Sequence, residues 1–564
     1  MELRFRIGPL VLSVAALMYP GGTCRAAAAL SCADMARLTV PSSAIGLGTS
    51  GATVEGATEV PAGGTAPKTY SEYCRLSVDI NPVDPQAPKI EMQLALPAAW
   101  NGKAMMFGGR GYDGAVPDVT NNVPAGPADR PTPLGRGYAV FASDSGHEGS
   151  DADKAGAFAL NAEALANYAH DALKKTRDAA VYLIGQRYAA SPERIYFAGG
   201  STGGREGLAV AQQWPQDFDG VIALYPAFNA ASLDLQFGRI TRALAAPNAY
   251  PSLGKRAALY NAAMQACDAL DGVQDGLISN QAACNATFDP STATVDGHAL
   301  RCPGGTDVAD SCLSDPQIAA MKVFNTPIAF DYPLASGENQ YPGFNVWGAD
   351  LGHAGTGLQS IVNRLGLSRM QPGFPMPGFG AAVDTVPYHS GFWDQWVKYF
   401  VTGNPTYDSL SLDPEHPGKW RARISALTLR LDVNKADLSE FAAHGGKLLM
   451  AHGTSDQLVS TRATEQYFNR VHSVMGPDRT GGFMRYYEIP GYNHAVSTVF
   501  AASWDSLGAL EDWVEKGIAP TAQVVTDTVG VPRRTRPLCE YPSWPRYRGA
   551  GDVDMASNFT CATE

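Results

Sequence analysis

The sequence predicts an α/β fold in which a parallel sheet is interrupted by a large insertion. Apolar strand-like runs alternate with helix-like runs before residue 229 and again after residue 440, as expected for strands joined by crossover helices. Between these positions the alternation gives way to prolines, glycines and aromatic residues. We therefore expect two sheet-forming parts, 30–228 and 441–564, and an inserted lid domain, 229–440.

The composition is typical of a folded soluble protein and argues against nucleic acid as a partner. The 564 residues exceed what one ordinary core needs, and 45% of them are hydrophobic. The formal net charge is −12, and no basic run stands out that could neutralise phosphates.

The first 29 residues are typical of an export signal. Two arginines precede an apolar run at 7–17, and alanines at 26–29 offer a cleavage site. The run is too short to span a bilayer, so we expect no membrane partner. A lipoprotein anchored at Cys24 is the alternative, but Thr23 is larger than the small residue normally found before such a cysteine. We expect a secreted or periplasmic protein.

Removal of the signal would take Cys24 with it and leave eight of the nine cysteines. An even number in an exported chain indicates disulfides, and free buried thiols are the alternative. Connectivity does not follow from sequence alone. The simplest scheme joins the cysteines in chain order: Cys32 with Cys74, Cys267 with Cys284, Cys302 with Cys312, and Cys539 with Cys561.

The first sheet-forming part leads to a nucleophile elbow with Ser201 at its tip. A serine on such a turn has a strained backbone, and small residues are needed where strand and helix pass closely. Gly199 and Gly203 provide that space, although a glycine-rich turn that merely contains a serine is the alternative. The predicted strands lie within 89–97, 103–107, 138–147, 195–200 and 219–227, and a crossover helix lies within 164–188.

The strand at 103–107 ends in a glycine-rich loop, 108–114. Glycines let backbone N–H groups approach a ligand closely. In a serine hydrolase this loop supplies the second donor to the oxyanion, the first being the N–H of the residue after the nucleophile, here Thr202. We favour Gly111 as the second donor, with an ordinary turn as the alternative.

Two later strands lead to candidates for the acid and the base. The run from 446 ends at Asp456, and the run at 483–489 leads to His494. The order Ser201, Asp456, His494 is that of α/β-hydrolases, so the sequence predicts the α/β-hydrolase fold with a large inserted lid domain. His147 and His452 are weaker candidates for the base, because both precede Asp456.

The insertion contains an acidic loop at 267–277, with three aspartates within eight residues and two turn glycines. These residues suit a hard cation with oxygen ligands, and backbone carbonyl groups of Val273 and Leu277 would complete the site. A solvated acidic turn is the alternative. Farther on, an aromatic stripe at 392–400 is expected to pack in a core.

These motifs resemble the tannase and feruloyl esterase family, which includes bacterial mono(hydroxyethyl) terephthalate hydrolases. The resemblance covers nearly the whole mature chain. It rests on the elbow 199–207, the run 219–223, the acidic loop, His452-Gly453 with Asp456, and Gly491-Tyr492 with His494. It implies a structural Ca²⁺ whose ligands are Asp268, Asp271, Val273, Asp275 and Leu277.

The chain departs from the family at two positions. Members typically have a cysteine directly before the nucleophile and another directly after the catalytic histidine, joined by a disulfide. Here Gly200 and Ala495 occupy these positions, so no unpaired thiol remains. Packing alone must hold the histidine loop, and we expect a more mobile or more heat-sensitive site.

The triad and the resemblance predict a secreted serine esterase that hydrolyses esters of aromatic acids, of the gallate, ferulate or mono(hydroxyethyl) terephthalate type. The alternatives are a serine acyltransferase or peptidase of the same fold, and a non-catalytic secreted binding protein. Arg364, chosen only for its place in the lid, is a candidate to pair with a substrate carboxylate; a surface arginine is the alternative. The preferred acid and the oligomeric state do not follow from the sequence.

Overall fold

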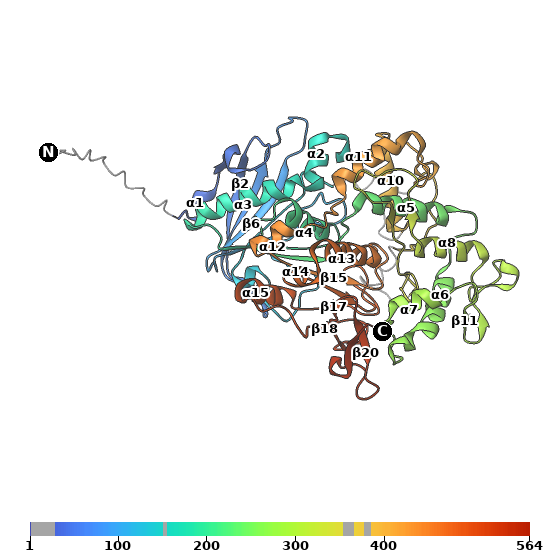
Figure 1. The fold of residues 1–564 in the computed structure, drawn as a ribbon. Helices are drawn as coiled ribbons and strands as arrows, with labels where there is room; N and C mark the ends of the chain where they lie inside the picture. The colour runs from blue at the N-terminus through green and yellow to red at the C-terminus, as the bar shows by residue number, and fades with distance from the viewer. Residues whose placement is uncertain (2–28, 150–154, 354–365, 377–384, 564) are drawn as a thin grey trace.

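The computed structural model describes residues 1, 29–149, 155–353, 366–376 and 385–563 (Figure 1). All but the first and last residues of the predicted export signal lie outside the described residues, and so does Arg364. Within the described ranges, no helix combines the length and the apolar character needed to cross a bilayer.

Ten strands of the described chain form one central sheet. In spatial order they are β1 (Thr39–Val40), β2 (Ala52–Val60), β5 (Tyr73–Ile80), β6 (Ile90–Pro97), β8 (Ala139–Ser143), β7 (Lys103–Phe107), β9 (Arg194–Gly200), β10 (Gly220–Leu224), β15 (Lys447–Gly453) and β16 (Met484–Ile489). The strands from β8 to β16 are parallel, and β1, β2, β5 and β6 extend the sheet with antiparallel pairs. The predicted strands all belong to this sheet.

The parallel strands are apolar on both faces, which places a hydrophobic core on each side of the sheet. In β10, Val221 and Ala223 face one core, while Ile222 and Leu224 face the other. Helices α3 (Ala172–Tyr188), α4 (Thr202–Gln213) and α13 (Thr461–Met475) contribute to the first core, and α15 (Ser506–Lys516) contributes Trp513 to the second. The helix predicted at 164–188 is divided into α2 (Ala162–Ala166), a π-helical turn (Asn167–Asp171) and α3.

The insertion lies between two strands that are neighbours in space. β10 and β15 pair in parallel, so the chain leaves the sheet after Leu224 and returns to the adjacent position at Lys447. The intervening helices are α5 (Ala230–Ala245), α6 (Leu253–Cys267), α7 (Gln281–Thr287), α8 (Asp315–Asn325), α10 (Tyr388–Gln395), α11 (Arg421–Leu431) and α12 (Ser439–His444). Two short strand pairs accompany them: β11 (Thr294–Val295) with β12 (His298–Ala299), and β13 (Ile328–Ala329) with β14 (Gln340–Tyr341). Figure 1 shows α5, α6, α7, α8 and α10 on the side of the molecule away from the N-terminal strands, whereas α12 is drawn over the central sheet.

The aromatic stripe of the insertion packs in a core, as expected, but one of its rings also lines a cavity. Trp393 and Trp396 are fully buried, and their rings stack with centroids 5.7 Å apart. Phe392, at the start of the stripe, lies against a cavity described below.

Four disulfides confirm the pairing of the cysteines in chain order. They join Cys32 to Cys74, Cys267 to Cys284, Cys302 to Cys312, and Cys539 to Cys561. Two of them lie in the insertion, one ties the N-terminal helix α1 (Cys32–Met35) to β5, and one closes the C-terminal segment. The C-terminal segment contains β17 (Ala502–Ser503), β18 (Val524–Asp527), β19 (Thr535–Pro537), β20 (Trp544–Tyr547) and β21 (Phe559–Ala562). Elsewhere in the described chain, β3 (Gly63–Thr65) pairs with β4 (Lys68–Tyr70), and α14 (Pro477–Gly481) precedes β16.

Candidate active site

Ser201 lies on the sharp turn between β9 and α4. Its φ of 62° and ψ of −123° put a non-glycine residue in a strained region of backbone space, and such strain is held in place only by the surrounding structure. The glycines beside it are required by packing: a Cβ atom on Gly199 would lie 2.3 Å from the carbonyl oxygen of Gly203. The turn therefore exposes the Ser201 side chain at the end of the strand.

Asp456 and His494 meet at the carboxyl ends of β15 and β16. The imidazole Nδ1 of His494 lies 2.8 Å from Oδ2 of Asp456. The Asp456 side chain is fully buried, and its other oxygen, Oδ1, accepts hydrogen bonds from the backbone N–H groups of Leu458 and Val459 at 2.8 and 2.9 Å. Burial alone would raise the pKa of Asp456, but attraction to His494 and hydrogen bonds with His452 and His494 hold the pKa below its usual range.

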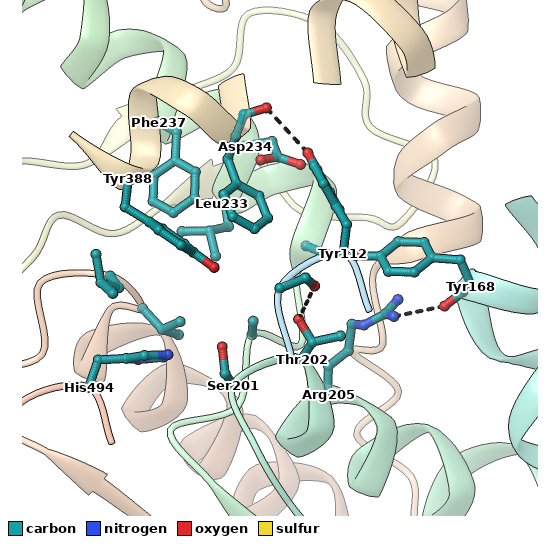
Figure 2. A pocket seen from close by; sticks show the side chains of 16 residues that line it. Tyr112, Tyr168, Ser201, Thr202, Arg205, Leu233, Asp234, Phe237, Tyr388 and His494 are labelled. Carbon is teal, nitrogen blue, oxygen red and sulfur yellow. Dashed lines mark hydrogen bonds between the residues drawn. The ribbon is translucent and has the colours of Figure 1, made fainter. Parts of the chain in front are cut away.

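Ser201 and His494 line the same cavity (Figure 2). Among the described residues, Ser201 Oγ has no hydrogen bond to His494. Catalytic hydrogen bonds are often long in structures without substrate and tighten when substrate binds. The arrangement is therefore an open form of a serine, histidine and aspartate constellation.

The two other histidines considered from the sequence occupy different places. His452 is fully buried behind Asp456, with Nε2 3.2 Å from the same oxygen that contacts His494 and with Nδ1 2.9 Å from Thr464 Oγ1. His147 is also buried, its Nε2 lies 2.7 Å from the backbone oxygen of Tyr112, and burial lowers its pKa to about 4. Neither histidine lines the cavity that contains Ser201.

Two backbone donors of the glycine-rich loop after β7 are already used. The N–H of Gly108 donates to Ala198 O at 3.0 Å, and that of Gly109 donates to Glu206 Oε2 at 2.8 Å. The N–H groups of Gly111 and Thr202 have no hydrogen-bond partner in the described parts of the chain. Thr202 Oγ1 donates to the Gly111 carbonyl oxygen at 2.5 Å, so these two residues lie side by side. Both line the Ser201 cavity.

Ser201 lies where two pockets meet. The inner pocket runs between the elbow and the insertion, and Figure 2 shows it from close by; its walls include Tyr112, Leu233, Phe237, Tyr388 and Phe392. The outer, larger pocket is lined by the glycine-rich loop, by residues 117–124 and by Ala495. Both pockets also contain Gly111 and His494. A substrate can thus extend to both sides of the serine.

Sequence reasoning did not find most residues of the inner pocket. Apart from the predicted Ser201, Thr202, Gly111 and His494, only Tyr112 and Phe392 carried a signal. Tyr112 follows Gly111 in the glycine-rich loop, and Phe392 belongs to the aromatic stripe that was expected to pack in a core. Leu233, Asp234 and Phe237 lie on α5 and Tyr388 lies on α10, within the insertion, where no periodic pattern linked them to the elbow.

Tyr225 lies next to Gly200, one of the two positions where the family typically has a cysteine. A Cβ atom on Gly200 would come within 2.5 Å of the Tyr225 ring, which is almost fully buried. The same ring packs against the His494 imidazole, with centroids 4.8 Å apart. On the other side, Tyr492 Oη donates to the backbone oxygen of Ala495 at 2.6 Å. Aromatic packing and this hydrogen bond therefore support the histidine loop.

Replacing Gly200 by alanine is expected to destabilise the protein by about 1–3 kcal/mol, because the buried Tyr225 ring has to move away from the new methyl group. The displaced ring also shifts His494, so kcat falls as well. Thermal melting and ester turnover measure both effects. The matched control is Gly185→Ala in α3, where a Cβ atom meets nothing within 4 Å; its melting temperature should stay the same or rise. Equal melting of the two variants would contradict this role of Tyr225.

The acidic loop is folded, and two of its three carboxylates are engaged by other groups of the protein. Asp275 pairs with Arg536 of β19, and Asp268 accepts hydrogen bonds from the Gly276 backbone N–H. Asp271 is fully buried, and its Oδ2 has no partner among the described residues. Within those residues, no group of three or more His, Cys, Asp or Glu side chains is arranged to hold a metal ion. The expected calcium site thus lacks structural support here.

Comparison with known proteins places the chain among ester hydrolases. It is 38% identical to an uncharacterized esterase of Agrobacterium fabrum over 94% of this chain and 93% of that protein. It is 30% identical to the mono(2-hydroxyethyl) terephthalate hydrolase of Piscinibacter sakaiensis, covering 88% and 87% of the two chains.

Solved structures with the same fold include feruloyl esterase B from Aspergillus oryzae. That structure has a TM-score of 0.73 and 23% identity, covering 92% of this chain and 98% of the other. Tannin acyl hydrolase from Aspergillus niger has a TM-score of 0.66 and 20% identity, covering 91% of each chain. A family model described as tannase and feruloyl esterase matches residues 74–562. The chain therefore belongs to the tannase and feruloyl esterase family.

Proposed function

We propose that this carboxylic ester hydrolase cleaves esters of aromatic acids through an acyl-serine intermediate. The observation that carries the proposal is the meeting of Ser201, the His494–Asp456 pair and two unused backbone donors at one end of a pocket lined with aromatic rings. Family membership supports the aromatic acyl group, since relatives are named as feruloyl esterases and as a terephthalate monoester hydrolase.

In the proposed mechanism His494 is the general base. Its Nδ1–H donates to Asp456, so Nε2 is unprotonated and can take the proton of Ser201 Oγ during attack on the ester carbonyl. Asp456 keeps the imidazole in this tautomer and stabilises its charged form. His494 then protonates the departing alcohol, and water, activated by the same base, releases the acid from the serine.

Backbone N–H groups of Thr202 and Gly111 are proposed to bind the negative charge that develops on the carbonyl oxygen. A donor of this kind contributes about 3 kcal/mol to lowering the barrier. The proposal is supported by the absence of other hydrogen-bond partners for these two groups within the described structure and by their place beside Ser201. Gly108 and Gly109 are excluded, because their N–H groups are already used.

The inner pocket is proposed to hold the acyl group, and the outer pocket the alcohol. Residues 229–440, the proposed lid domain, supply α5 and α10 to the inner wall. Offset contacts between flat rings favour an aromatic acyl group there. The outer pocket is larger and more polar, so it tolerates different alcohols.

The test of this proposal is hydrolysis by the purified mature protein of methyl gallate, methyl ferulate, mono(hydroxyethyl) terephthalate and a short aliphatic ester. We expect at least one aromatic ester to be hydrolysed much faster than the aliphatic ester. A panel of amide substrates and acceptor alcohols separates an esterase from a peptidase or an acyltransferase. Absence of hydrolysis, together with absence of labelling by a fluorophosphonate probe, would favour the binding protein.

We also propose that the acidic loop binds Ca²⁺. The proposal rests on the family resemblance and on the buried, unpartnered carboxylate oxygen of Asp271, a group that is costly to bury without a cation or a proton. The proposed ligands are Asp268, Asp271 and Asp275 with the backbone carbonyl groups of Val273 and Leu277.

Removal of calcium is expected to lower the melting temperature, because an ion that binds only the folded state stabilises it. The measurement is thermal melting after chelation with EGTA and dialysis, and again after addition of CaCl₂ or MgCl₂. Recovery with Ca²⁺ but not with Mg²⁺ is the expected result. An identical melting curve for metal-free and calcium-loaded protein would contradict the proposed calcium site.

Export to the periplasm or the medium is proposed from the signal-like N-terminus and the four disulfides, which persist in oxidising compartments.

A further inference from the structure

The inner pocket contains an acidic side chain that the proposed mechanism does not use. Asp234 lies on α5, and Figure 2 shows it across the pocket from Ser201, with its carboxyl group beside the hydroxyl of Tyr112. The residue is only 4% exposed, and its Oδ1 has no hydrogen-bond partner among the described residues. Leaving a buried polar atom without a partner is costly, so such an atom in a binding pocket favours a role in binding the substrate.

The surroundings of Asp234 provide rings rather than a cation. Tyr112, Phe237, Tyr388 and Phe392 line the same pocket. The Arg205 guanidinium is also buried there, but it donates to the backbone oxygens of Ala169 and Tyr168 at 3.1 and 2.8 Å and lies over the Tyr168 ring. Figure 2 shows the guanidinium beside Tyr168 and away from Asp234. It therefore does not neutralise the carboxyl group.

A second acid makes the negative form of Asp234 still less favourable. Asp432 is half-buried near it and accepts hydrogen bonds from Ser232 Oγ and the Ala231 backbone N–H. Burial, followed by repulsion from Asp432, raises the pKa of Asp234 well above its usual range, and the neighbouring Tyr112 hydroxyl only partly opposes this. The uncharged form of the Asp234 carboxyl group is thereby favoured, and an uncharged carboxyl group can both donate and accept a hydrogen bond.

A neutral carboxyl group among aromatic rings matches a flat substrate that carries a hydroxyl group. The ring fills the space between the aromatic side chains, and the hydroxyl pairs with the carboxyl group. A carboxylate on the ring does not match, because it would enter a pocket of low dielectric constant beside Asp234. Arg205, the cationic side chain among the described lining residues of this pocket, already donates to backbone oxygens.

We propose that Asp234 is the specificity-determining residue of the acyl pocket, which selects aromatic acyl groups with a ring hydroxyl and rejects those with a ring carboxylate. This inference rests on the proposed function, since it assigns the inner pocket to the acyl group. It also separates this chain from its relative that is named for a terephthalate monoester, whose acyl group carries a carboxylate.

The experiment compares kcat/KM for matched pairs of methyl esters: 4-hydroxycinnamate with cinnamate, 4-hydroxybenzoate with benzoate, and monomethyl terephthalate with methyl 4-hydroxybenzoate. The wild-type chain is expected to prefer the hydroxylated ester of each pair by about 10-fold or more, since a site built to bind a hydroxyl strongly rejects analogues that lack it. It should hydrolyse monomethyl terephthalate least.

Two variants test whether Asp234 causes the preference for hydroxylated esters. In Asp234→Leu, the ratio of kcat/KM for the hydroxylated ester to kcat/KM for the unsubstituted ester should fall at least tenfold. The fall should come mainly from a lower kcat/KM for the hydroxylated ester. Asp234→Asn, which keeps a donor and an acceptor, should retain part of the ratio. The ratio within one variant does not depend on the fraction of folded enzyme, so partial misfolding cannot imitate the effect.

The possible failures are distinct. If the wild-type chain hydrolyses no aromatic ester, the proposed function fails. If it hydrolyses both members of each pair but the ratio is the same in wild type and Asp234→Leu, the proposed function stands and the role of Asp234 is wrong. Preference of the wild type for monomethyl terephthalate would likewise overturn the inference.

Discussion

Replacing Ser201 by alanine is expected to lower ester turnover by about 10⁵–10⁶-fold and to leave the fold intact. The variant lacks the oxygen that attacks the ester, while the strained turn remains held by the backbone hydrogen bond from Ser201 N to Leu224 O at 3.1 Å. Turnover of the best ester from the substrate panel and labelling by a fluorophosphonate probe are the two measurements. Melting and circular dichroism should match those of the wild type.

The matched control for this prediction is Ser43→Ala, which changes an exposed serine far from the elbow in sequence. This variant should retain full turnover and full labelling. Labelling of Ser201→Ala at the wild-type level, or turnover above about one percent of wild type, would show that another residue is the nucleophile.

Replacing Asp456 by asparagine is expected to lower kcat by about 10⁴-fold, because the base would then be held in the wrong tautomer. Oδ1 of Asp456 accepts from two backbone N–H groups, so the amide oxygen of asparagine would take that position. The amide NH₂ would then face His494 Nδ1, which would have to accept a hydrogen bond. His494 would carry its proton on Nε2, toward Ser201, and could not act as the base.

The comparison variant is His452→Gln, because His452 contacts the same carboxylate oxygen from the buried side. We expect a loss of about tenfold in kcat, together with a lower melting temperature, since His452 supports Asp456 but does not line the pocket. The pH dependence of kcat should keep its shape. A loss in His452→Gln as large as that in Asp456→Asn, with the wild-type melting temperature, would assign the base to His452.

The pocket shows why substrate selection did not follow from the sequence. The elbow and the acid and base loops each follow a strand, so their places could be expected from the rule that parallel strands present their carboxyl ends at one edge of the sheet. Asp234 and Tyr388 follow no such rule. They lie far from Ser201 in the chain and reach the pocket only through packing of α5 and α10 against the glycine-rich loop, where Tyr112 Oη donates to the Phe392 backbone oxygen.

The positions of the missing family disulfide provide a second contact that could not be predicted from the sequence. Absence of cysteine at positions 200 and 495 suggested a loosely held histidine loop. In the structure, the ring of Tyr225, which follows β10, fills the space next to Gly200 and packs on His494. No sequence pattern links residue 225 to residue 494, because their contact depends on how the ends of different strands meet.

The sequence by itself determined the fold class and the parallel strands of the sheet, and the simplest chain-order scheme for the cysteines proved correct. Each of these depends on local signals: apolar periodicity, glycines at a tight turn, and cysteines close together in the chain. Tertiary structure alone decided that His452 supports Asp456 from the buried side, which backbone N–H groups remain unused, and which side chains from the insertion line the acyl pocket. These features depend on distances between side chains and on burial, which arise only when the insertion packs over the end of the sheet.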